Sequence, residues 1–109
     1  PTVKGQKLIP TAWVNFNGQG TVAIRDSESI SSITDAATGD YVINFSNNMA
    51  NTNYCVIFSS GDAAVYIASG RGGNSFNTVQ STRAGCRNGN TQAWYDPEVL
   101  CVAVIGSQA

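Results

Sequence analysis

AWVNFNGQGTVAIRDSESISSITDAATGDYVINFS, residues 12–46, contains four short runs in which apolar and polar side chains alternate. Turn residues separate the runs, for example Gly18–Gly20 after the first and Thr38–Asp40 before the fourth. The apolar members are Val14, Phe16, Val22, Ile24, Ile30, Ile33, Tyr41, Ile43 and Phe45. Alternation with a period of two residues, bounded by Gly, Asn and Asp, is typical of antiparallel strands. The segment therefore predicts four of them.

The remainder of the chain continues as strands and turns, and no segment of useful length fits a helical period. Further strands are predicted at 54–58, 64–68, 76–81 and 99–105. Residues 54–58 (YCVIF) are apolar on both faces, which predicts a central strand, whereas the polar segment 83–92 predicts a long loop. About eight short strands at this spacing indicate an all-β fold, a small antiparallel β-sandwich.

Length and composition indicate one domain with an uncharged surface. The chain has 109 residues, of which 42% are hydrophobic and 12% charged, and its net charge is -1. We expect residues 1–10 to form a linker and residues 11–109 to form the sandwich. So small a net charge argues against nucleic acid as a partner. Membrane insertion is not expected either, because the longest apolar run, Val99–Ile105, falls far short of about 20 residues.

The residue types needed for catalysis or metal binding are largely missing. The chain has no His, so the commonest general base and metal ligand is absent. Cys55 and Cys101 fall in strand-like runs and Cys86 in a Gly-rich loop; an odd count argues against a disulfide framework. The acidic residues are scattered through turns and select no catalytic pair. We therefore expect no enzymatic activity, no cofactor and no metal.

Aromatic residues beside polar ones suggest binding instead. Trp94 and Tyr95 follow a segment rich in Arg, Asn, Thr and Gln, the residue types that contact sugars and protein epitopes. Two interpretations stay open for this pair, a place in the core and a place in a contact surface. Trp13 lies off the face of Val14 and Phe16, which predicts either a core or a subunit-interface position.

Three sequence runs carry a family resemblance: AWVNFNGQGTVAIR at 12–25, SSITD at 31–35 and TGDYVINF at 38–45. They are similar to runs in the carboxy-terminal domains of bacteriophage and prophage tail fibres and related receptor-binding proteins. Residues 96–97 (DP) and 99–106 (VLCVAVIG) resemble the last strand of that family. The match is good over the first 46 residues, moderate over the last dozen, and slight over 55–95.

The resemblance implies a β-sandwich at the distal end of a fibre, assembled as a homotrimer. Such a domain would attach the virion to a bacterial surface glycan or outer-membrane protein, residing at the fibre tip and, during assembly, in the host cytoplasm. The poorly matching segments between Gly70 and Tyr95 would then contact the host. The candidate receptor-binding residues are Arg71, Asn74, Arg87, Asn90, Trp94 and Tyr95.

Two other functions stay open. The domain could be a structural trimerisation module, or a decoration of the capsid or tail, that carries another domain and binds no host. It could also be a glycan-cleaving enzyme, if two of its scattered carboxylates met across a sugar site.

Overall fold

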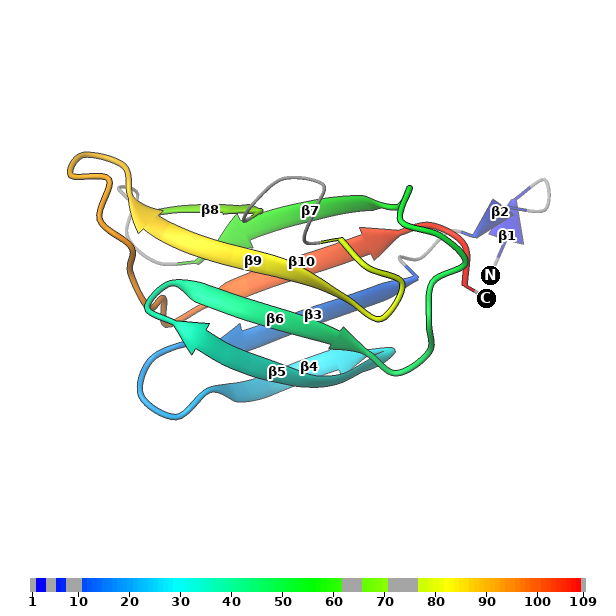
Figure 1. Cartoon of the computed structure of the whole chain (residues 1–109), viewed down its shortest axis with the longest axis horizontal. Coiled ribbons are helices and arrows are strands. Elements are labelled where there is room, and N and C mark those ends of the chain that lie inside the picture. Colours follow the sequence, from blue (N-terminus) through cyan, green and yellow to red (C-terminus); the bar gives the residue numbers. More distant parts are fainter. Residues whose placement is uncertain (1, 4–5, 8–10, 62–65, 71–76, 109) are drawn as a thin grey trace.

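The computed structural model describes residues 2–3, 6–7, 11–61, 66–70 and 77–108. Two four-stranded sheets among these residues form a β-sandwich (Figure 1). One four-stranded sheet has the order β4 (Ala23–Glu28), β3 (Ala12–Asn17), β10 (Leu100–Ile105), β7 (Cys55–Ser60). The other has the order β5 (Ile30–Ala37), β6 (Asp40–Phe45), β9 (Ser81–Asn88), β8 (Tyr66–Gly70). A separate ladder pairs β1 (Thr2–Val3) with β2 (Gln6–Lys7), and all pairings are antiparallel. In this part of the chain there is no helix long and apolar enough to cross a membrane.

The core lies between the two sheets and follows the predicted alternation on β3 and β6, but not on β4, where Ile24 is exposed. Val14 and Phe16 on β3 point inward and are buried, whereas Trp13 and Asn15 are only partly covered. The Phe16 ring meets the edge of the Tyr41 ring from the opposite sheet, with centroids 5.1 Å apart. The other large buried side chains in the centre are Ile43, Met49, Leu100, Val102 and Val104. Burial of side chains of this size, at about 1.5–3 kcal/mol each, holds the sheets together.

The predicted loop at 83–92 is wrong, because residues 83–88 belong to strand β9, which lies inside its sheet between β6 and β8. Thr82, Ala84 and Cys86 are its buried side chains. Small and polar residues at the inward positions gave no hydrophobic period. The strand predicted at 76–81 is displaced for the same reason: residues 77–80 are not in a strand, and Phe76 lies outside the described residues.

The prediction that residues 54–58 form a central strand is also wrong, because β7 is the edge strand of its sheet. Its outward positions carry Cys55, Ile57 and Ser59, and the apolar Ile57 lines a hollow on the outer face of the sheet. Cys55 and Cys101 lie in strands β7 and β10 as predicted, and there Cys55 is exposed and Cys101 partly exposed. Cys86, predicted in a Gly-rich loop, lies instead in strand β9 and is buried.

The described sandwich begins and finishes at one end. Ala12 at the start of β3 lies opposite Val104 near the finish of β10, and the Thr11 hydroxyl donates to the Gly106 carbonyl at 2.6 Å. The other end carries the connections 18–22, 38–39 and 89–99, which lie together on the left in Figure 1. We call it the loop end.

Candidate functional site

Three side chains form a row across the outer face of β8, β9 and the segment after it, at the loop end. Ile67 on β8 lies opposite Arg87 on β9, and Arg87 lies opposite Trp94 through an isolated bridge. Asn88 N–H donates to the Ala93 carbonyl, and Tyr95 N–H donates to that of Cys86. Residues directly opposite in antiparallel strands share a face, so the three side chains lie side by side. We call this set the Arg87 row.

The Arg87 row presents aromatic and apolar surface around one cation. Trp94 is 41% exposed and Ile67 47% exposed. The Arg87 guanidinium carbon lies 5.8 Å from the centroid of the Trp94 ring, within the range of cation–π attraction. Arg87 Nε is buried, and among the described residues it has no hydrogen-bond partner.

Arg83, on the same face of β9, is held differently. Its Nε donates to Asp40 Oδ1 at 3.2 Å, and Nη2 makes a second, short contact with Oδ2. Asp40 is only 4% exposed, so this bidentate ion pair fixes Arg83 against β6. No carboxylate of the described residues is paired with Arg87 in this way. Arg87 is therefore the arginine of β9 whose charge the described residues leave uncompensated.

Asn90 lies beyond the row, at the tip of the turn that follows β9. Asn88 Oδ1 accepts the N–H groups of Asn90 (2.8 Å) and Thr91 (3.1 Å), and Gln92 closes the turn with φ 64°. The side chains of Asn90, Thr91 and Gln92 are exposed. This turn returns the chain so that Trp94 meets Arg87.

Tyr95 has partners that differ from those of Trp94. Its ring stacks on that of Tyr66, with centroids 3.8 Å apart and planes 9° from parallel. Gln19 Nε2, from the β3–β4 connection of the other sheet, donates to the Tyr95 hydroxyl at 3.1 Å. Tyr95 therefore contacts residues of both sheets at the loop end.

The segment that carries Trp94 is fastened to the sandwich by Asp96. Asp96 Oδ1 accepts the Gly39 N–H at 2.8 Å and lies 2.8 Å from the Tyr41 hydroxyl, which is also 2.9 Å from the Gly18 carbonyl oxygen. Gly18 N–H donates in turn to the Pro97 carbonyl at 2.8 Å. We call Gly18, Gly39, Tyr41 and Asp96 the Asp96 latch. These hydrogen bonds join three connections of the loop end. They hold the segment that carries Trp94, and with it one end of the Arg87 row, against the sandwich.

Burial affects the tyrosine of this latch electrostatically. Removal from water, and then the hydrogen bond to Asp96, raise the pKa of Tyr41 well above its ordinary value of 10.0. The hydroxyl is therefore a proton donor, not a base, at any physiological pH.

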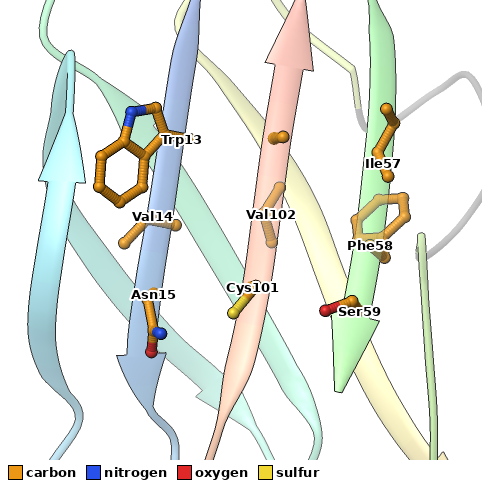
Figure 2. Close-up of a pocket in the computed structure, with 9 residues that line it drawn as sticks. Trp13, Val14, Asn15, Ile57, Phe58, Ser59, Cys101 and Val102 are labelled. Carbon is orange, nitrogen blue, oxygen red and sulfur yellow. The ribbon is translucent and has the colours of Figure 1, made fainter. Parts of the chain in front are cut away.

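A second surface lies on the outer face of the other sheet (Figure 2). Its hollow, of about 490 Å³, is lined by residues of β3, β10 and β7, six of which alternate with the core positions and so face outward. Register places them in two rows, Trp13–Ala103–Ile57 and Asn15–Cys101–Ser59. Figure 2 shows Trp13 and Ile57 on opposite sides of it. Trp13 is therefore outside the core, on the surface that the subunit-interface alternative requires.

The structure brings Arg87 and Trp94 together, sets Asn90 beyond them, and engages Tyr95 in a ring stack. Arg71 and Asn74 lie outside the described residues. Sequence reasoning missed Ile67, Tyr66 and Gln19. Nothing local marks them, because each acts through a partner on a distant strand or connection.

Comparison with known proteins adds no relative: no family model, no curated protein and no solved structure matches the chain.

Proposed function

We propose that this domain is an adhesion module, the receptor-binding tip of a phage tail fibre, which attaches the virion to a bacterial surface glycan or outer-membrane protein. The tail-fibre assignment rests on the sequence resemblance over residues 12–46 and 96–106. The all-β sandwich agrees with the fold that this resemblance implies. Binding is the activity proposed, with no covalent step.

One observation carries the proposal: an exposed aromatic and an uncompensated arginine lie side by side on a rigid sheet, at the loop end. Trp and Arg dominate binding hot spots because they combine a large apolar area with directional donors. The Asp96 latch fixes the segment, so little conformational entropy is lost when a partner binds.

The hollow on the other outer face supports self-association as a homotrimer. Ile57 is 52% exposed and Ile105 48% exposed, although both lie on strands of a regular sheet. On the outer face of the opposite sheet, by contrast, Asn44 Nδ2 donates to Ser32 and Thr34. Covering the apolar face with other copies would remove this surface from water and would also cover the edge strand β7. Three copies would combine three weak receptor sites by avidity.

Adsorption of fluorescently labelled protein to a panel of Gram-negative strains tests the adhesion function. The panel pairs strains with full-length and truncated lipopolysaccharide. We expect binding to a subset of strains and its loss in Arg87→Gln and Trp94→Ala. Arg25→Gln is the matched control, because it removes the same charge from the edge strand β4 of the other sheet. Adsorption that is absent from every strain, or unchanged in both variants, would contradict the proposal.

The structural trimerisation module remains the second candidate, favoured by the exposed apolar face around Ile57. Light scattering on the purified chain separates the two functions when it is combined with the adsorption assay. A trimer that adsorbs to no strain supports the structural module, whereas a trimer that adsorbs through the Arg87 row supports the fibre tip.

A further inference from the structure

We propose that the Arg87 row binds a carboxylate-bearing sugar, such as a uronic acid residue of a surface polysaccharide. The inference rests on the proposed function, since it names the ligand class of the same surface. It starts from the contrast between the two arginines on the outer face of β9.

The state of the guanidinium points to an anion. Arg83 has its carboxylate in Asp40, whereas Arg87 has no carboxylate partner among the described residues and its buried Nε lacks an acceptor. A buried donor without an acceptor is unfavourable, because it has lost its hydrogen bonds to water and gained none in return. A ligand carboxylate that reorients the Arg87 guanidinium would satisfy these donors, in the bidentate geometry that Arg83 makes with Asp40.

The neighbours of Arg87 point to a sugar ring as the carrier of that carboxylate. Trp94 offers an exposed indole on one side of the cation and Ile67 an exposed aliphatic group on the other. The C–H face of a pyranose packs on such surfaces, while its hydroxyls need polar groups at the rim. Asn90, Thr91 and Gln92 supply exposed polar side chains in the adjoining turn.

Among the described strands β6 and β9, the second of which carries Arg87, no uncompensated carboxylate opposes an anion. Asp40, the carboxylate of β6 nearest in register, is neutralised by Arg83 and buried. In contrast, the apolar hollow on the other sheet is flanked by Glu28 and Asp26 on β4, opposite Trp13 and Asn15. An acidic polymer is therefore better accommodated on the face of the Arg87 row than on the face of the hollow.

The probes are three uronic acid polymers of different stereochemistry: polygalacturonate, alginate and hyaluronan. Binding to each polymer is compared with binding to its carboxyl-reduced, neutral product. We expect binding of the intact chain to at least one acidic polymer, and weaker binding, by about tenfold or more, to its reduced product. Arg87→Gln should lose the preference for the acidic form, Trp94→Ala should weaken binding to both forms, and Arg25→Gln should change neither. Circular dichroism of each variant confirms that the fold is retained.

No binding to any acidic polymer, or equal binding to acidic and reduced forms, would overturn the ligand class. The adsorption assay tests the adhesion function separately. If the variants lose cell adsorption but the acidic and reduced polymers bind equally, the proposed function is supported and the acidic-sugar ligand is rejected. Polymer binding that depends on Arg87, with unchanged cell adsorption, would keep the acidic-sugar site and reject its role in host attachment.

Discussion

The Tyr41 hydroxyl lies 2.8 Å from Oδ1 of Asp96, a residue 55 positions further along the chain. Tyr41 belongs to strand β6 and its side chain is fully buried, whereas Asp96 belongs to the irregular connection into β10. The contact therefore joins the segment that carries Trp94 to the core of the sandwich, near the start of β6.

Replacing Tyr41 by Phe should lower the free energy of unfolding by about 1–2 kcal/mol. The ring keeps its edge contact with Phe16, but Asp96 and the Gly18 carbonyl lose their shared donor. Urea unfolding followed by tryptophan fluorescence measures the change. Tyr66→Phe is the control, since no described residue hydrogen-bonds its hydroxyl, and its effect should stay within about 0.5 kcal/mol. Equal effects of the two substitutions would contradict the latch.

Stability should fall steeply as the pH rises above about 10. Burial raises the pKa of Tyr41 and of Tyr54 in the folded protein, while an unfolded tyrosine ionises near 10.0. Above that pH the unfolded state binds fewer protons than the folded state, so the free energy of unfolding decreases by up to about 1.4 kcal/mol per pH unit for each tyrosine. Below about pH 9 both states are protonated and this contribution is constant.

Tyr41→Phe should remove one of these two proton-linked losses. Unfolding midpoints in urea, measured between pH 8.5 and 11.5 for the two proteins, give the difference in slope. Parallel slopes would show that Tyr41 ionises as easily in the folded state as in the unfolded one.

Gly39→Ala should destabilise the protein far more than Gly20→Ala. Both glycines have positive φ, +65° and +60°, so an alanine at either position pays about 1 kcal/mol for its backbone conformation. At Gly39 the new Cβ would also lie 2.5 Å from the Cys86 carbonyl oxygen and 2.8 Å from the Tyr95 nitrogen, whereas at Gly20 nothing lies within 4 Å. We expect a loss of about 3 kcal/mol or more at Gly39, measured by urea unfolding. Similar losses at the two sites would exclude the close approach of residue 95 to the β5–β6 turn.

Ile57→Lys should convert the proposed trimer to monomers without unfolding the domain. Ile57 is 52% exposed, so its replacement costs the isolated fold little, but it places a charge in the hollow that other copies would cover. Light scattering gives the mass and circular dichroism the fold. Ala36→Lys adds the same charge at an exposed position of β5, the edge strand of the other sheet, and should leave the mass unchanged. A mass that Ile57→Lys does not alter would exclude this face as the interface.

Alternation predicts a strand from sequence when large apolar residues occupy its inward positions. Val14 and Phe16 on β3, and Tyr41, Ile43 and Phe45 on β6, meet this condition, and both strands were predicted. Strand β9 does not meet this condition, because its inward residues are small or polar. It is a strand because it pairs with β6 on one side and β8 on the other. Apolar residues on both faces of a strand can also give a wrong prediction. They predicted a central position for β7, which is an edge strand.

The residues of the candidate site could be selected from the sequence only by residue type, and that selection remains a prediction. Arg87 and Trp94 were selected as residue types common in binding surfaces, and the register then shows that they are neighbours. The Asp96 latch could not be predicted, because its bonds join side chains and backbone groups of three separate connections.

Strand β3 begins at Ala12, directly opposite Val104 near the end of β10, so the sandwich starts and ends at neighbouring points. Chain ends that lie close together allow a domain to be inserted into a surface turn of an unrelated carrier. Residues 11–108 transplanted in this way would display Trp94 at the pole farthest from the two junctions. A carrier that holds a known number of copies would then present that number of Trp94 surfaces.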